Sequence, residues 1–168
     1  MIRSLASPAR PWLVVVAVVV VTLGLDQLSK RAISDWLGRD AERHRWEIAG
    51  PFLAFEYVEN TGAAFGLLAG RVWLLTLIAL VVAALFTYLL RGAKHDRLQG
   101  VALGLIVGGA AGNIVDRIRI GHVTDFLAVG IWPKFNLADT AITVGLVLIA
   151  GSVLAEEREP DDPEPRKM

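Results

Sequence analysis

The chain has 168 residues, which is enough for one domain, and its 17 lysines and arginines are balanced by 17 aspartates and glutamates. A net charge of zero with no basic face argues against a nucleic-acid partner. The absence of cysteine excludes disulfides, thiol nucleophiles and cysteine metal sites, and the three histidines lie too far apart in sequence to suggest a zinc site. The composition is 54% hydrophobic with a mean hydropathy of +0.51, which exceeds that of soluble domains and points to a membrane protein.

Four apolar segments approach the length of about 20 residues that a helix needs to cross a bilayer. They cover residues 12–33, 72–90, 98–115 and 137–155. Arginines before the first segment would also fit a cleaved signal peptide, but the apolar run leads into DQLSKR without a small-residue cleavage site, so we favour an uncleaved span. We therefore expect an all-α polytopic membrane protein with four transmembrane helices.

Glycine recurs every four residues in the third segment, at positions 100, 104, 108 and 112. This spacing places the four glycines on one face of a helix. Small residues let a neighbouring helix approach closely, which is how helices associate in lipid, and we interpret this face as a packing surface.

Four spans put both chain ends on the same side of the membrane. The density of lysine and arginine is higher on that side, which favours cytoplasmic termini, whereas the raw number of basic residues does not. We expect a single membrane domain over residues 1–155, followed by a charged, proline-rich, disordered cytoplasmic tail over residues 156–168.

The segment between the first two spans contains a predicted strand. PFLAFEYVEN, residues 51–60, is rich in aromatic and branched side chains and is bounded by Gly-Pro and by Asn-Thr-Gly. We expect it to belong to a small extracytoplasmic β-sheet on the membrane surface, followed by a flexible connection of small residues, NTGAAFGLLAG. The charged stretch at 34–47 allows no structural prediction. Four tryptophans fall near predicted boundaries, as is usual at membrane interfaces: Trp36, Trp46, Trp73 and Trp132.

Several polar residues fall at membrane depth, where an ionisable group costs several kcal/mol and marks a functional site by default. Asp26 and Lys30 are four residues apart on one helix, so we favour a structural ion pair over a direct role in chemistry. Lys30 could also reach to the membrane edge. Asn113, Asp116 and Arg117 share a helix face in this interpretation. A polar cluster that satisfies itself and a cluster that supports an active site are equally compatible with that spacing.

Asp125 lies in the predicted loop between the third and fourth spans, and Asp139 lies at the start of the fourth span. Asp139 alone could be a helix N-cap or a first-turn acid. A continuous helix would hold the two about 21 Å apart. Gly121, Gly130 and Pro133 predict instead that the chain loops back and brings both carboxylates to the membrane surface. Two carboxylates that meet can share one proton and activate a water for peptide hydrolysis.

The blocks DQLSK, NTGAAFG, GNIVDRIRIGHVTDF and FNLADTAI occur in the order and spacing of the lipoprotein signal peptidases (signal peptidase II). Over nearly its whole length the chain resembles this family of bacterial membrane aspartic peptidases. The resemblance implies that Asp125 and Asp139 are the catalytic aspartates. It implies supporting or substrate-binding roles for seven further residues: Asp26, Lys30, Asn60, Asn113, Asp116, Arg117 and Asn136. From the residues alone, Asn60 is more simply interpreted as a turn asparagine.

The resemblance also implies a substrate, which is a diacylglyceryl-prolipoprotein cut just before its lipidated cysteine. It further implies contact with membrane lipid, inhibition by globomycin-type cyclic peptides, and an active site on the outer face of the bacterial cytoplasmic (inner) membrane, with both termini cytoplasmic. We expect a monomer without a cofactor or metal. Two other classes are compatible with the size and the spans: a small proton-coupled transporter and a non-enzymatic membrane assembly protein. The first would need inverted repeats or a polar path on both sides, and the second leaves Asp125 and Asp139 unexplained.

Overall fold

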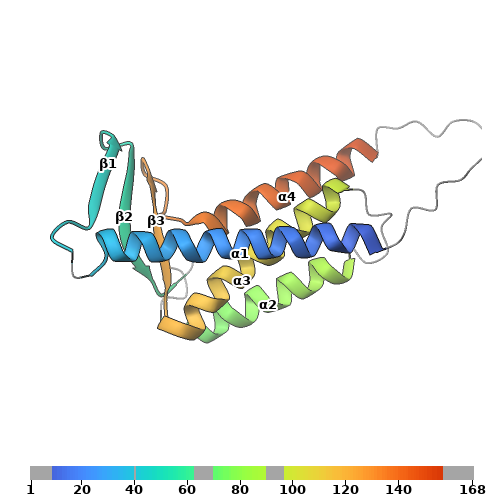
Figure 1. Ribbon diagram of the computed structural model, residues 1–168, viewed down its shortest axis with the longest axis horizontal. Helices are drawn as coiled ribbons and strands as arrows, with labels where there is room; N and C mark the ends of the chain where they lie inside the picture. The colour runs from blue at the N-terminus through green and yellow to red at the C-terminus, as the bar shows by residue number, and fades with distance from the viewer. Residues whose placement is uncertain (1–8, 40, 63–69, 90–96, 157–168) are drawn as a thin grey trace, which may run out of the picture.

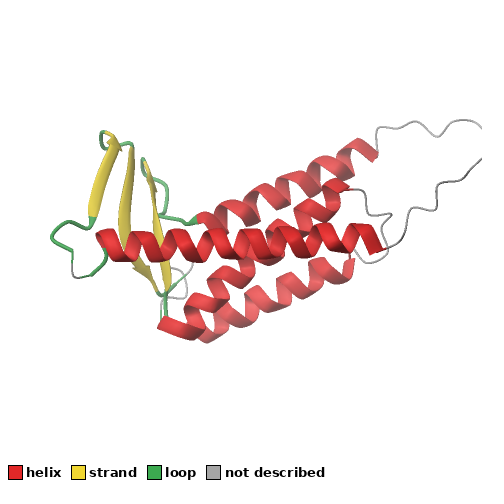
Figure 2. Ribbon diagram, in the orientation of Figure 1, coloured by secondary structure: helices red, strands yellow, loops and turns green. Residues whose placement is uncertain are grey.

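A computed structural model of the chain describes residues 9–39, 41–62, 70–89 and 97–156. Helices lie side by side along one long axis, and a three-stranded sheet covers one end of them (Figure 1, Figure 2). The start of the first helix and the end of the last one lie together at the opposite end (Figure 1). The sheet therefore closes the end of the helices that is remote from both chain termini.

The helices are α1 (Ala9–Leu37), α2 (Val72–Leu89), α3 (Arg97–Ile120) and α4 (Leu137–Glu156). The prediction of four apolar helices is confirmed. The third helix continues beyond residue 115, so the polar side chains that follow are still helical. The tail lies outside the described residues except for Glu156, which ends α4.

Three segments of the described residues are long and apolar enough to cross a membrane: Trp12–Leu37, Arg97–Ile120 and Leu137–Ala155. Within α2 the corresponding apolar stretch is shorter, Trp73–Leu85. Most of the described side chains of α2 face outward, including Trp73 and Tyr88. The protein is thus a multi-pass membrane protein built on α1, α3 and α4, with α2 packed against α3.

The glycine face of α3 packs directly against α1, which confirms the packing prediction. Three of its members face that helix: Gly104, Gly108 and Gly112. The α1 side chains opposite them also recur every four residues: Val18, Thr22 and Asp26. The two helices run in the same direction, and each glycine leaves the space that one α1 side chain fills.

Gly108→Ala is expected to destabilise the protein by about 1–3 kcal/mol because the added methyl group overpacks this contact. A Cβ at residue 108 would lie 2.8 Å from the Cβ of Thr22 and 3.1 Å from the carbonyl oxygen of Val19. Thermal unfolding in detergent measures the effect, and Gly24→Ala is the matched control because a Cβ there would meet no packed atom within 4 Å. Equal melting temperatures for the two variants would contradict the packing role.

The sheet has the order β1-β2-β3, with neighbouring strands antiparallel. Its strands are β1 (Arg45–Ala49), β2 (Leu53–Asn60) and β3 (Val123–Val129). β2 confirms the predicted strand, and β1 lies in the charged stretch that allowed no prediction. The small-residue connection after Asn60 lies mostly outside the described residues.

β3 corrects one expectation, because Asp125 lies in a strand and not in a loop. Asp125 pairs with Val58 in the register of β2 and β3. Aspartate is disfavoured in strands, so the local sequence argues against a strand at Asp125. Pairing with β2 overrides it. The predicted chain breaks are the turns at the two ends of β3, where Gly121 and Gly130 adopt φ of 78° and 51°.

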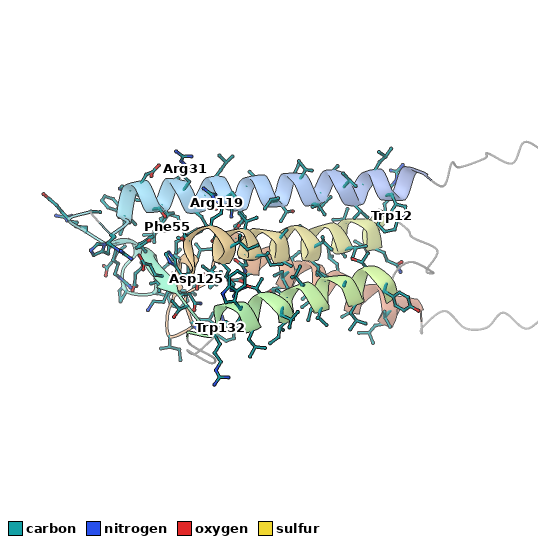
Figure 3. All side chains as sticks on the ribbon, turned by 90° about the horizontal axis from the view of Figure 1, so that it is seen from below. Trp12, Arg31, Phe55, Arg119, Asp125 and Trp132 are labelled. Atoms are coloured by element: carbon teal, nitrogen blue, oxygen red, sulfur yellow. The ribbon has the colours of Figure 1, made fainter. Side chains whose placement is uncertain are left out.

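A row of aromatic rings fixes the sheet to the end of α1. The ring of Trp36 lies 5.6 Å from that of Trp46 and 6.2 Å from that of Phe55, and Phe55 lies 6.3 Å from Phe126. Successive strand residues point to opposite faces, so Phe126 anchors one face of β3 while Asp125 points from the other. Figure 3 shows Asp125 at the junction of the sheet and the helices.

Candidate active site

A cavity of about 290 Å³ lies where β3 meets the sheet ends of α3 and α4, and both Asp125 and Asp139 line it. The chain loops back as the glycines and proline predicted, so the two carboxylates face one space. Other polar side chains on the cavity wall are Asn60, Asn113, Arg117 and Lys134. Within the described ranges, no three histidine, aspartate or glutamate side chains are grouped so as to hold a metal ion.

Asp139 is held by the start of its own helix. The main-chain N–H of Asp139 donates to Oδ1 of Asn136 at 2.9 Å, and the N–H of Asn136 donates to Oδ2 of Asp139 at 3.3 Å. This reciprocal pair is a capping box, in which Asn136 is the N-cap and Asp139 is the first-turn acid. Oδ1 of Asp26 accepts a hydrogen bond from the N–H of Ala138, in the same first turn, at 3.0 Å. The cap therefore fixes the direction in which the Asp139 carboxylate points.

Asp125 accepts one amide hydrogen bond on each carboxylate oxygen. The side-chain amide of Asn60 donates to Oδ2 and that of Asn136 donates to Oδ1, both at 2.7 Å. Asn60 also accepts the N–H of Gly62 at 2.9 Å, so its interpretation as a turn asparagine and its contact with Asp125 both hold. Asn136 thus links the two acids, because it caps the helix of Asp139 and bonds to Asp125.

The carboxyl group of Asp125 is only 1% exposed. Burial raises its pKa from 3.8 to about 7. The hydrogen bond from Asn60 favours the ionised form and opposes this rise, whereas the nearby charge of Asp139 adds to it. A carboxyl group in this environment can hold a proton near neutral pH.

Lys30 lies at the centre of a buried ion cluster beneath the cavity. Its ammonium group lies 3.0 Å from Oδ2 of Asp26 and 2.9 Å from Oδ2 of Asp116. The predicted pairing with Asp26 is confirmed. The alternative, that Lys30 reaches the membrane edge, is wrong because the side chain is 3% exposed and points into the bundle.

The same ammonium group decides which atom donates and which accepts in the hydrogen bonds between Lys30 and Asp139. Lys30 donates to Oδ1 of Asn113 at 2.8 Å, and the Asn113 amide donates to Oδ1 of Asp139, also at 2.8 Å. An ammonium group can only donate, so the carbonyl of Asn113 must face Lys30 and its amide must face Asp139. Asn136 donates to the same Asn113 oxygen at 3.2 Å.

Asn113 is linked to both Asp116 and Arg117, but on different sides. Lys30 bonds to Asn113 and to Asp116, and Asn113 lines the same cavity as Arg117. Asp116 faces α1, where it accepts hydrogen bonds from the side-chain amide of Gln27 at 2.9 Å and from the N–H of Thr124 at 3.3 Å. Arg117 faces the cavity of the two aspartates. Adjacent helix residues are turned by about 100° from each other, so spacings of three and four could not decide which partner each would meet.

The residue pattern by itself does not identify two members of this network. Gln27 donates to Asp116 and to the carbonyl of Gly112 at 3.2 Å, and its only signal is its place between polar neighbours in DQLSK. Asn136 was implied by the resemblance alone. The pattern Asn-x-x-Asp directly before an apolar run is a capping-box signal and could have identified it.

The sequence profile of the family described as Signal peptidase (SPase) II matches residues 18–155. The chain belongs to the signal peptidase II family. Two curated relatives are both lipoprotein signal peptidases. The one from Moorella thermoacetica is 40% identical over 140 residues, which cover 80% of this chain and 89% of the relative. The one from Burkholderia mallei is 38% identical over 155 residues, which cover 88% of this chain and 89% of the relative.

Two solved structures, both described as a bacterial membrane enzyme structure by the in meso method, have the same fold. The 2.3 Å structure has a TM-score of 0.78 and 27% identity, with 90% of this chain and 94% of that chain covered. The 1.9 Å structure has a TM-score of 0.71 and 29% identity, with 83% and 92% covered. The resemblance seen in the sequence motifs is thereby confirmed, and this signal peptidase II is a membrane aspartic peptidase.

Proposed function

We propose that Asp125 and Asp139 are the catalytic pair with which this member of the signal peptidase II family hydrolyses a peptide bond. The observation that carries the proposal is their shared cavity, in which both carboxylates are held by asparagine amides. Amide groups orient a carboxylate but do not take up its proton. Two acids in one cavity cannot both ionise cheaply, so they share one proton.

The two environments suggest which acid holds that proton. Burial favours the proton on Asp125, since it raises the pKa of this carboxyl group to about 7. Asp139 lies in the first turn of α4, where the positive end of the helix dipole favours a negative charge. Asp139 would then act as the general base on a water in the cavity, and Asp125 would donate to the scissile carbonyl. The resulting gem-diol collapses when a proton reaches the leaving amine.

The substrate we propose is a prolipoprotein whose cysteine already bears a diacylglyceryl group, cut just before that cysteine. The names of the relatives support this substrate class. A second, mostly apolar cavity of about 220 Å³ lies between α2, α3 and α4, and it shares Asn113 and Arg117 with the cavity of the aspartates. An acyl chain could enter it sideways from the bilayer and hold the peptide next to the dyad. A globomycin-type cyclic peptide is expected to block the same space.

We further propose that α2 is a fourth span of a single membrane domain over residues 1–155. Its 18 residues rise about 27 Å, close to the hydrocarbon thickness of about 30 Å. The sheet, whose strand β3 carries Asp125, and the start of α4, which carries Asp139, lie at one end of the helices (Figure 1). The start of α1 and the end of α4 lie at the other end. This arrangement supports an active site on the side of the membrane opposite to both termini. The higher density of lysine and arginine near the termini supports the cytoplasmic side for the termini and the outer face of the bacterial inner membrane for the site.

The test is a cleavage assay with purified protein in detergent. A diacylglyceryl-modified prolipoprotein is expected to be cut, and mass spectrometry should locate the cut before the lipid-bearing cysteine. The same precursor without the lipid is the control and should remain intact. Equal cleavage of both precursors would contradict the substrate proposal. Ion flux in liposomes without any cleavage would favour the transporter class.

Peptidase activity is expected to fall as the pH rises through about 7, because the shared proton is lost from the dyad.

Asn60→Ala removes a hydrogen bond that favours the ionised form of Asp125, so the fall in activity at alkaline pH should move to higher pH. The measurement is kcat/KM against pH for the unaltered protein and for Asn60→Ala. The pH at which kcat/KM falls is compared between the two, and not the maximal value of kcat/KM. A fall that stays at the same pH, or moves to lower pH, would contradict this role of Asn60.

A further inference from the structure

A cavity of about 510 Å³, larger than that of the aspartates, has no part in the proposed reaction. It lies between α1 and α3 at their sheet ends, beneath Thr124 of β3. Lys30 and Asp116 form its floor, and both are buried and paired to each other. Lys30 also bonds to Asn113, which lines the cavity of the aspartates, so the Lys30 ammonium group lies between the two cavities.

Two arginines lie on the wall of this cavity, Arg31 from α1 and Arg119 from α3 (Figure 3). The nearest carboxylate to Arg31 is that of Asp35 at 4.0 Å, and their side chains are 82% and 76% exposed, so the attraction is weak. Arg119 makes a long contact of 3.4 Å to the side-chain oxygen of Gln27. Both guanidinium groups therefore keep donors for a ligand.

The mouth of the cavity suits a single phosphate group. Lys30 lies between Asp26 and Asp116, whose two negative charges outweigh its own, so the buried floor attracts no anion. The exposed charged side chains on the wall are Arg31, Arg119 and Asp35, so the positive charge that a phosphate can meet is that of the two arginines at the surface. The planar fork of a guanidinium group matches two phosphate oxygens at once, so two arginines suit a phosphate better than a metal or an apolar ligand.

An exposed apolar stripe leads away from the cavity along α1. Leu28 lies on the cavity wall, and Leu25 and Val21 follow it at spacings of three and four on the same helix face. The segment Trp12–Leu37 is long and apolar enough to cross a membrane, so this stripe faces acyl chains. Trp36, in the last turn of the same helix, is half-exposed, and tryptophan is typical of the level of lipid headgroups.

We infer that this cavity binds the phosphate of a membrane phospholipid between Arg31 and Arg119, with its acyl chains along α1. A bound lipid would bridge α1 and α3, the two helices that carry Lys30 and Asn113. A free phosphate ester offers the same chemistry, but it would gain nothing from the apolar stripe. The inference is independent of the dyad, so Asp125→Asn protein should bind the lipid as the unaltered protein does.

The experiment uses full-length protein in detergent and three probes. The first is phosphatidylglycerol, the second is a diglucosyl diacylglycerol with the same acyl chains and an uncharged headgroup, and the third is glycerol 1-phosphate. Native mass spectrometry should find phosphatidylglycerol retained, and its titration should raise the melting temperature. Arg31→Gln and Arg119→Gln should each weaken this apparent affinity about tenfold. Arg43→Gln, at an exposed arginine outside the cavity, is the matched control and should leave it unchanged.

Four outcomes would overturn the inference. Equal binding of the glycolipid would show that acyl chains alone are recognised, and equal binding of glycerol 1-phosphate would show a site for free phosphate esters. Unchanged affinity in both glutamine variants would remove the arginines from the site. If a glutamine variant fails to fold, Arg31→Lys and Arg119→Lys are tested instead. They keep the positive charge but lose the planar guanidinium group that can donate to two phosphate oxygens. Unaltered preference of these lysine variants for phosphatidylglycerol over the glycolipid would also overturn it.

Discussion

Asp125→Asn and Asp139→Asn are each expected to lower kcat by about 10²–10⁴-fold or more, the range that acid–base groups contribute. An amide has nearly the shape of a carboxyl group, but it can neither take the proton of the attacking water nor hold the shared proton. The loss should therefore appear in the chemical step, in protein that still folds. The measurement is turnover of a diacylglyceryl-prolipoprotein in detergent.

Both variants should also lose stability, because both oxygens of Asp125 and both oxygens of Asp139 accept hydrogen bonds. Both oxygens of Asp125 accept amide hydrogen bonds, so an asparagine there turns its own amide toward Asn60 or Asn136 and leaves two donors facing each other. Such a mismatch costs about 1–3 kcal/mol. Asp35→Asn is the matched control, because Asp35 is exposed and lies outside the cavity of the aspartates. Near-normal turnover by Asp125→Asn or Asp139→Asn would exclude that residue from the catalytic pair.

The helices could be predicted because each needs a long apolar run, and such runs are visible without knowledge of neighbours. β1 and β3 could not be predicted in the same way. β1 lies in a charged stretch and is held mainly by pairing with β2. β3 contains Asp125, and its partner strand lies on the far side of two helices in the sequence. Its strand character comes from long-range pairing and burial, which local propensity does not contain.

Two features of the candidate site could be predicted from the sequence: the energetic cost of a charged group at membrane depth, and the spacing of residues along a helix. Two acids beside apolar runs stand out because membrane depth makes them expensive. The pairing of Asp26 with Lys30 follows from a spacing of four. The directions of Asp116 and Arg117 do not, because they depend on how α3 is rotated against α1 and α4. That Lys30 meets side chains of a second helix is a property of the helix packing, which the glycine face permits but does not specify.

Lys30→Met is expected to destabilise the protein by about 3–5 kcal/mol, because it leaves Asp26 and Asp116 as buried carboxylates without a counter-charge. Lys134→Met is the matched control for stability. That lysine is 41% exposed and lies 3.5 Å from Glu56, so its loss should change the melting temperature little. Thermal unfolding in detergent measures both.

Lys30 is also expected to act as a positioning residue, because it makes the shorter of the two hydrogen bonds to the Asn113 oxygen and so turns the Asn113 amide toward Asp139. The double variant Lys30→Met/Asp116→Asn separates this role from charge balance. Removing one of the uncompensated carboxylates should recover part of the melting temperature. It cannot restore the donor that orients Asn113, so kcat per folded molecule should stay low. Recovery of kcat in parallel with stability would instead show that Lys30 serves the fold alone, and that the amide facing Asp139 is held by Asn136 and the helix cap.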